Sequence, residues 1–359
     1  MPRTRPRRLA SHHPNPPRSH PPSIQPRLSA TVQLSDGYQK QRAVIKFAED
    51  YVYGLFDTFN FSSNLFDIIV APGTPDHSIT WQQIGDECFG AVTLLSEGRY
   101  TEGNQTFSIA CNRLNNVLGS NDYEMIIKLW PICLRLYRAG LKLNNFAMLE
   151  HFLHFFRRIA LHRYPQGHPI PSLLKVLCQA STKEFFNVVQ VGYLRTIHCL
   201  ERSLGFGNAV VLSVWSNYLK KADDHALPAS ALTSRYESVL QEAQNSFTPI
   251  GTRTIEILHQ YTYAAYYNAN DYDLTWNLAS QMVNLAESFE LMGKHPEWCL
   301  ATQGYALAAK LMYILSQQTG HGDQGTVTLR SAISRLELGD RECRTRALML
   351  GGILGTSSV

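Results

Sequence analysis

The chain has 359 residues, of which 44% are hydrophobic and 17% charged, so it can bury a sizeable core in one elongated domain or two compact ones. Its formal net charge is +4, but residues 1–30 hold six arginines and no acid, so the remainder carries 4 − 6 = −2. A body so near neutrality disfavours nucleic-acid binding by the folded part. No stretch has the roughly 20 apolar residues of a membrane span, and we expect none.

Cysteine usage points to a reducing compartment. The seven cysteines are odd in number, widely spread and never paired as CxxC. Free cysteines are among the most buried residue types, and disulfides are rare in the cytosol and nucleus. We therefore expect buried, reduced thiols and a location in the nucleus or cytoplasm.

Residues 1–36 are predicted to be a disordered basic tail. Eight prolines, six arginines and three histidines fall within residues 1–30, with few large apolar residues to offset the entropy of ordering. Four interpretations of the tail stay open: a nuclear-import signal around Arg3–Arg8, a mitochondrial transit peptide, a proline-rich ligand, or no function. The prolines oppose the amphipathic helix of a transit peptide.

From Gln39 onward, apolar residues recur every three or four positions, which predicts helices throughout. Breaks rich in Gly, Pro and Asn separate them. The first helix runs from Gln39 to about residue 59, and the others are expected at 79–97, 99–117, 122–140, 144–163, 169–181, 183–204, 207–222, 231–246, 252–268, 271–289, 296–317, 326–338 and 340–350.

Grouped in pairs, these helices repeat every 38 to 47 residues, which is typical of a helix-pair solenoid. The fold class is therefore predicted to be all-α, with an α-solenoid over residues 37–350 and a flexible C-terminus over 351–359. Each pair would bury one face by stacking on its neighbours, so that the units share one continuous core.

The clearest unit resembles the tetratricopeptide repeat. Gly98–Tyr100 forms its turn, and Gly103, Phe107 and Ala110 follow at intervals of three, four and three. The resemblance implies that the small residues let paired helices approach, that Phe107 fills the space between them, and that Tyr100 is wedged there too. Asn270–Tyr272 repeats the turn later in the chain. The repeat spacing exceeds the 34 residues of that family, so the units are tetratricopeptide-like.

A second resemblance is to the helical region of fungal proteins that carry a short N-terminal domain named after a cryptic loci regulator. It rests on Tyr51–Phe56, Gly167–Pro169 and Leu336–Cys343 and covers residues 39–350. No segment here corresponds to the short domain, which is thought to bind DNA in that family. The resemblance therefore implies a helical scaffold.

Catalytic motifs are not found. The sequence has no GxxxxGK[ST], HExxH or GxSxG, and Gly205–Gly207 lacks the third glycine of a dinucleotide site because Val210 stands in its place. Ser172–Lys175 fits SxxK without an accompanying KTG. We assign no catalytic residue and no cofactor, and we expect a protein that is not an enzyme.

A histidine stripe is the first candidate binding surface. His151, His154, Arg158 and His162 share one face of a helix at helical spacing. Two imidazoles three residues apart can share a metal, but further ligands are missing nearby, so we predict no metal site. The stripe could receive an acidic peptide, or it could be a solvated face whose cations complement the helix C-terminus.

A tyrosine stripe is the second candidate. On helix 252–268 one half is apolar, while the other carries Tyr263, Tyr266 and Tyr267 among polar groups, including His259. Tyrosine provides broad contact area with a hydrogen-bonding tip, as in recognition surfaces, but solenoid helices also bury two sides. Packing is favoured for Tyr266 and recognition for Tyr263 and Tyr267.

Together these features predict a non-catalytic scaffold that binds a peptide or helix of another protein on the concave side, lined by the first helix of each pair. One alternative is a nuclear chromatin-associated regulator whose Arg-rich tail contacts nucleic acid. Another is an enzyme whose site is assembled from scattered residues. No membrane partner is expected.

Overall fold

The computed structural model describes most of the chain from residue 36 onward. The described residues are 36–58, 62–63, 68–69, 77–119, 122–222, 227–246, 251–290, 298–319, 322–337, 347–348 and 350–353. Apart from Asp36, the tail predicted over residues 1–36 lies outside them, as do residues 354–359 of the predicted C-terminus.

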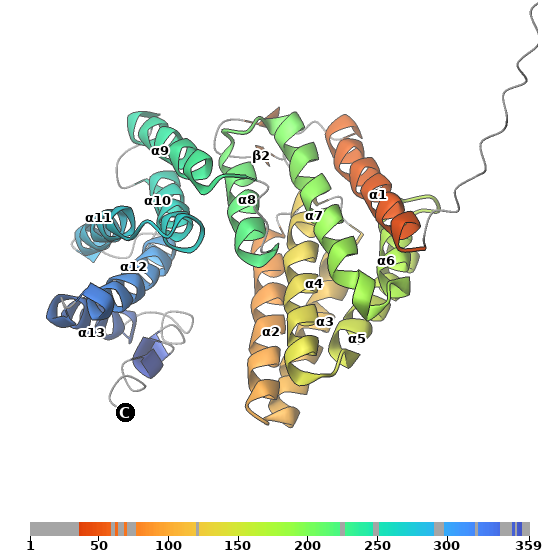
Figure 1. The fold of residues 1–359 in the computed structure, drawn as a ribbon, viewed down its shortest axis with the longest axis horizontal. Coiled ribbons are helices and arrows are strands. Elements are labelled where there is room, and N and C mark those ends of the chain that lie inside the picture. Colours follow the sequence, from red (N-terminus) through yellow and green to blue (C-terminus); the bar gives the residue numbers. More distant parts are fainter. Residues whose placement is uncertain are drawn as a thin grey trace, which may run out of the picture. The chain divides into compact units, whose positions relative to one another are not determined.

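The chain is all-α, as predicted (Figure 1). A minimal antiparallel ladder also occurs, formed by β1 (Ser62–Ser63) and β2 (Ile68–Ile69). Residues 347–348 and 350–353 are helical, near the helix expected at 340–350. The helices are α1 (Asp36–Thr58), α2 (Ser78–Ser96), α3 (Tyr100–Val117), α4 (Tyr123–Leu143), α5 (Ala147–Arg163), α6 (Pro169–Gln179), α7 (Thr182–Leu204), α8 (Ala209–Ala222), α9 (Ala229–Ser246), α10 (Thr252–Ala264), the π-helix η1 (Ala265–Ala269), α11 (Tyr272–Glu290), α12 (Trp298–Thr319) and α13 (Gly322–Glu337).

Capping residues fix where several helices begin and end. The Asp122 carboxylate accepts a hydrogen bond from the Glu124 N–H at 2.9 Å and so satisfies a free donor at the start of α4. This helix ends at Asn144, whose φ of 49° is left-handed. Ser181 and Glu184 form a reciprocal capping box at the start of α7. Local sequence therefore defines these boundaries.

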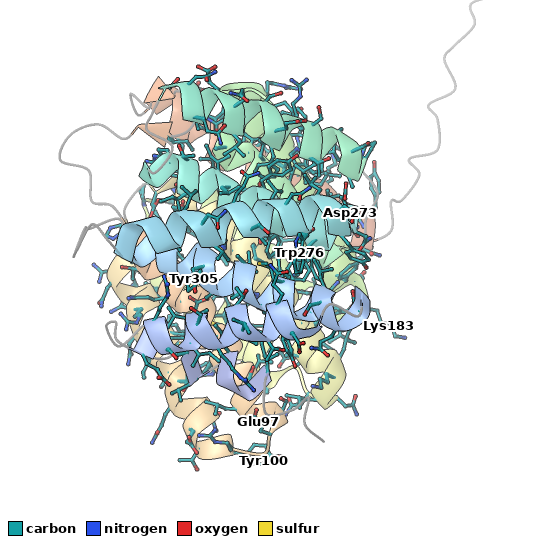
Figure 2. The ribbon with its side chains drawn as sticks, turned by 90° about the vertical axis from the view of Figure 1, so that its left-hand side faces the viewer. Glu97, Tyr100, Lys183, Asp273, Trp276 and Tyr305 are labelled. Atoms are coloured by element: carbon teal, nitrogen blue, oxygen red, sulfur yellow. The ribbon has the colours of Figure 1, made fainter. Side chains whose placement is uncertain are left out.

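The first helix pair, α2 and α3, largely confirms the expected repeat geometry. Gly98 ends α2 with a φ of +79°. A Cβ at Gly103 would lie 2.8 Å from Leu95, so glycine permits the close approach of the two helices, and Phe107 is buried at 8% exposure. The prediction that Tyr100 is wedged between the helices was wrong. Tyr100 is the first residue of α3 and is 67% exposed at the end of the hairpin (Figure 2), whereas Leu95 is the side chain that lies against Gly103 between the helices.

The third helix pair, α6 and α7, does not stack on its neighbours in simple chain order. Its second helix, α7, packs on α4, α8 and α1, whereas the short first helix, α6, packs mainly on α1 and α5. Gly192 of α7 lies at the closest point, where an added Cβ would be 2.5 Å from Val44 and 2.6 Å from Trp130. The Trp130 indole N–H donates to the Thr196 hydroxyl at 2.9 Å, which fixes the ring beside this glycine.

The core forms two hydrophobic clusters rather than the single one expected. The main cluster draws on α1 to α12, and a smaller one joins α11, α12 and α13 to residues 347–353. Val283 packs against both. None of the helices in the described ranges is long and apolar enough to cross a membrane.

Candidate functional site

The first candidate site is built on α5, because this helix buries only one of its faces. Its apolar residues at helical spacing pack into the main core, and the opposite side faces outward. The buried residues of α5 are Leu149, Phe152, Leu153, Phe156, Ile159 and Ala160. The outward side contains the predicted histidine stripe.

Aromatic contacts hold the side chains on this outward side of α5 in place. The His151 ring lies edge-on to Phe107 at a centroid distance of 6.0 Å and stacks on Phe155 at 6.5 Å. The Arg158 guanidinium carbon lies 5.4 Å from the Phe155 ring centroid. The structure thus brings His151, His154 and Arg158 together, as the sequence predicted. We call the following residues, which line a shallow depression of about 380 Å³, the α5 surface: His151, His154, Phe155, Arg157, Arg158 and Leu161.

Positive charge dominates around the α5 surface. Arg157, Arg158 and Arg163 of α5 and Lys175 of α6 form no ion pair with a carboxylate of the described residues. The Nε of Arg157 is buried without a hydrogen-bond partner in the same part of the chain. The single acid of α5, Glu150, lies at the opposite end from the arginines. A local excess of positive charge results.

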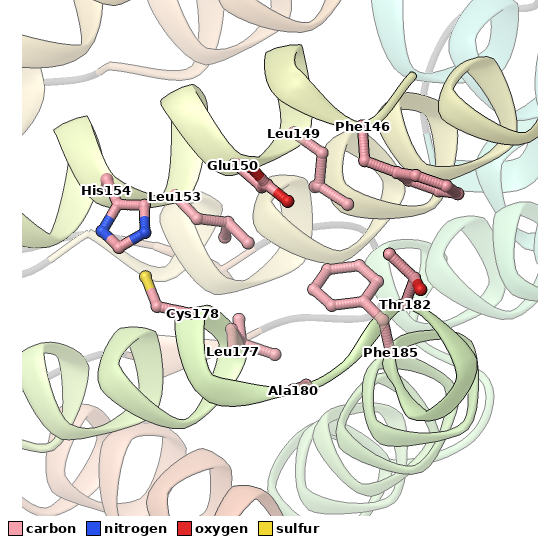
Figure 3. Close-up of a pocket in the computed structure, with 10 residues that line it drawn as sticks. All are labelled: Phe146, Leu149, Glu150, Leu153, His154, Leu177, Cys178, Ala180, Thr182 and Phe185. Carbon is pink, nitrogen blue, oxygen red and sulfur yellow. The ribbon is translucent and has the colours of Figure 1, made fainter. Parts of the chain in front are cut away.

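A pocket of about 180 Å³ adjoins this surface, and His154 lines both. Side chains of α5 face those of α6 and the start of α7 across it, with His154 and Cys178 at one end (Figure 3). Its volume is close to that of an apolar cavity of about 150 Å³ that holds benzene, so an apolar side chain fits by size, while Glu150, His154 and Thr182 add polar groups to the walls. We call it the α5–α6 pocket, and it is lined by Phe146, Leu149, Glu150, Leu153, His154, Leu177, Cys178, Ala180, Thr182 and Phe185.

The cysteines near this region are not activated. Burial raises the pKa of the Cys178 thiol, and the nearby Arg157 only partly opposes that effect. Burial raises the pKa of Cys88 to about 12 and that of Cys111 to about 11. A thiol reacts as its thiolate, so these residues are packing groups. The described cysteines are all free, namely Cys88, Cys111, Cys133, Cys178 and Cys199.

No group of three or more His, Cys, Asp or Glu residues that could hold a metal ion occurs within the described ranges. His151 and His154 are both in those ranges, on the α5 surface. The residues around them supply cations and aromatic rings, which suit an anionic ligand better than a metal cation.

The second candidate site lies where α10 continues into the π-helix η1. The apolar half predicted for this segment is buried as expected, whereas His259, Tyr263, Tyr266 and Tyr267 are half-buried. The ring centroids of Tyr263 and Tyr267 are 4.6 Å apart, and those of Tyr266 and Tyr267 are 4.8 Å apart. Tyr266 also contacts Tyr272 at 5.9 Å. The three tyrosines form one cluster, and burial raises the pKa of each.

Lys220 of α8 completes this cluster, and sequence reasoning missed it. Its Nζ lies 3.3 Å from the ring centroid of Tyr267 and 4.2 Å from that of Tyr263, which are cation–π distances. Lys220 lies far from the tyrosines in sequence, and the sole local signal was the basic pair Lys220–Lys221. Only the packing of α8 against α10 and η1 places it on the rings.

Lys220 has an unusual electrostatic environment. Burial, together with the charges of Lys310 on α12 and Arg135 on α4, lowers the pKa of Lys220 to about 8. Arg135 acts on Tyr263 as well, and its guanidinium carbon lies 5.4 Å from the Phe89 ring centroid. Lys220 and Tyr263 are therefore the members of this cluster whose pKa values depart strongly from the ordinary ones. Such strongly shifted groups concentrate at functional sites.

Comparisons with known proteins add no relative: no protein-family model matches the chain, and no curated protein matches it. The resemblance to fungal proteins related to the cryptic loci regulator therefore stays a prediction. So does the choice between nucleus and cytoplasm. The tail residues on which the chromatin hypothesis depends lie outside the described residues.

Proposed function

We propose that this protein is a non-catalytic interaction scaffold whose α5 surface and α5–α6 pocket together bind an acidic segment of another protein. The observation that carries the proposal is the continuity of the two features, since His154 lines both. A segment lying along α5 would place carboxylates against the arginines and one apolar side chain in the pocket. The lack of catalytic motifs in the sequence supports binding rather than catalysis.

Charge complementarity selects the kind of partner. Arg157 and Arg158 lie next to each other and form no ion pair with described carboxylates, so an acidic partner gains their attraction without first breaking one. Glu150 at the pocket end disfavours a second acid there. The partner's acids are therefore placed toward the C-terminal half of α5 and its apolar residue toward the N-terminal half.

The pocket supplies the apolar part of the recognition. Its walls include Leu149, Leu153, Leu177 and Phe185, which are at most 4% exposed and hence fixed in the core. A preformed pocket costs little ordering entropy on binding. A buried apolar anchor ringed by polar contacts is the usual arrangement of a binding hot spot.

The test is fluorescence anisotropy with a short synthetic peptide of glutamates around one central phenylalanine. Arg157→Glu/Arg158→Glu should weaken binding by about ten-fold or more, because attraction becomes repulsion. Arg42→Glu/Lys46→Glu is the matched control, since it makes the same charge change on exposed positions of α1. Equal weakening in both variants, or none in either, would contradict the proposal and support a solvated face.

Two further experiments distinguish the contribution of the pocket to binding from that of the charges. Ala180→Phe should fill the pocket and weaken binding of the phenylalanine peptide, while a peptide with alanine in place of phenylalanine should bind weakly to both proteins. Raising the salt concentration should weaken the charge-dependent part alone. Circular dichroism establishes that each variant is folded. Undiminished binding by folded Ala180→Phe would remove the pocket from the proposal.

A further inference from the structure

The α5 surface gathers more positive charge in one depression than a single carboxylate balances. Arg157 and Arg158 line the same depression of about 380 Å³, together with His151 and His154. Neither arginine forms an ion pair with a carboxylate of the described residues. One glutamate of a bound segment matches one guanidinium fork, whereas two glutamates placed side by side repel each other.

A row of aromatic contacts connects Arg158 to the core. Phe107 is buried in the main cluster, and the His151 ring lies edge-on to it at a centroid distance of 6.0 Å. Phe155 stacks on His151 at 6.5 Å, and the Arg158 guanidinium carbon lies 5.4 Å from the Phe155 centroid. These contacts restrict the rotamers of Arg158, so binding costs it less side-chain entropy than it costs a free arginine.

Arg157 contributes a donor that the protein leaves unsatisfied. Its Nε is buried and has no hydrogen-bond partner in the described part of the chain. A buried donor on a cation destabilises the free protein, and an anion bound at this guanidinium offsets that cost. Two negative charges do so more strongly than one. The helix dipole opposes this little, because Arg157 lies more than one turn before the end of α5 at Arg163.

The pocket and the depression also determine how far apart an apolar side chain and an anion bind. Leu153 lines the α5–α6 pocket, and Arg158, five residues later on α5, lines the depression. At about 1.5 Å of rise per residue, they are about 7.5 Å apart along the helix axis. An extended peptide advances about 3.3 Å per residue, so its anion belongs about two or three positions from its apolar residue.

We infer that the α5 surface binds a phosphorylated serine or threonine in a segment whose apolar residue occupies the α5–α6 pocket. The inference rests on the proposed function and names the modification that the partner carries. At neutral pH a phosphoserine carries a charge of about −1.5 to −2 on three acceptor oxygens, so it can accept a fork from each arginine. His151 and His154 line the same depression and supply further N–H donors.

Fluorescence anisotropy with three peptides of otherwise identical sequence tests this inference. Each carries a central phenylalanine, with phosphoserine, glutamate or serine three positions before and after it. The phosphoserine peptide should bind about ten-fold or more tightly than the glutamate peptide, and the serine peptide should bind most weakly. Equal affinity for the phosphoserine and glutamate peptides would overturn the inference.

Arg158→Lys distinguishes phosphate recognition from simple attraction of charge. Lysine keeps the charge but loses the planar fork, so the variant should lose most of its preference for the phosphoserine peptide. The glutamate peptide needs one fork and still has Arg157. Arg42→Lys, at an exposed position of α1, is the matched control and should change neither affinity. Circular dichroism establishes that both variants are folded. Equal losses for the two peptides, or no loss for the phosphoserine peptide, would contradict the role of Arg158.

Failure of this inference is distinguishable from failure of the proposed function. If the glutamate and phosphoserine peptides bind equally and both lose affinity in Arg157→Glu/Arg158→Glu, the acidic-segment scaffold stands and phosphate specificity is wrong. If neither peptide binds, both proposals are wrong. A phosphoserine peptide with alanine in place of phenylalanine should bind about ten-fold more weakly. Undiminished binding of that peptide would indicate a site for phosphate alone and overturn the inference.

Discussion

Gly192 offers a sharp test of how α1, α4 and α7 meet. Replacing it with alanine adds one methyl group at a point where the new Cβ would lie 2.5 Å from Val44 and 2.6 Å from Trp130. Both neighbours are fully buried, and the hydrogen bond from Trp130 to Thr196 opposes rotation of the ring. The methyl therefore requires helices to shift.

Two opposing effects determine how much Gly192→Ala changes the free energy of unfolding. Overpacking a filled core costs about 1–3 kcal/mol, and the rigid neighbours place this position at the upper end. Alanine in a helix interior is favoured over glycine by about 1 kcal/mol. The free energy of unfolding of Gly192→Ala should therefore fall by about 2 kcal/mol.

Urea denaturation followed by circular dichroism measures this change. Gly85→Ala is the control, since Gly85 is also inside a helix but a Cβ added there would meet no heavy atom within 4 Å. That variant should gain about 0.5–1 kcal/mol from helix propensity alone. A Gly192→Ala protein as stable as the unaltered one would refute the three-helix contact.

Three other predictions concern the repeat core, Lys220 and the tail. Phe107→Ala should lower the free energy of unfolding by about 3–5 kcal/mol, because Phe107 lies in the main core, and a loss under about 1 kcal/mol in urea titration would mean that it is not packed there. The pKa of Lys220 is about 8 when folded, below the ordinary lysine value of 10.5, so the unfolded state holds more protons between these pH values. Stability should therefore rise from pH 8 to 10.5 relative to Lys220→Met, and parallel profiles would contradict the lowered pKa. Deleting residues 1–35 should leave the melting temperature unchanged, because their composition predicts disorder, whereas a drop of several degrees would show that they contact the core.

Helix positions could be predicted from sequence because their signals are local. The apolar spacing and the glycine at Gly98 place α2 and α3 within two residues of their observed ends. Side-chain packing between helices is set by residues far apart in sequence. The repeat pattern predicted that Tyr100 lies between the helices, but the side chain that fills the space beside Gly103 is that of Leu95, which the pattern does not include.

The candidate sites likewise divide into features set within one helix, which the sequence predicts, and features set by packing between helices, which it does not. The histidine stripe could be predicted because its residues share one helix at regular spacing. The tyrosine stripe was found as well, but the assumed 100° per residue fails in the π-helix at 265–269, which brings Tyr267 onto Lys220. Lys220, Arg135 and Lys310 belong to three helices, so no spacing in the sequence connects them.

The proposal for the α5 surface is tested most directly by hydrogen exchange of the chain with and without the glutamate–phenylalanine peptide. Binding should slow exchange in residues 147–163 and 177–185, which carry the α5 surface and the α5–α6 pocket, and leave α1 unchanged. Slowing confined to other helices, or equal slowing along the whole chain, would contradict a binding site on α5.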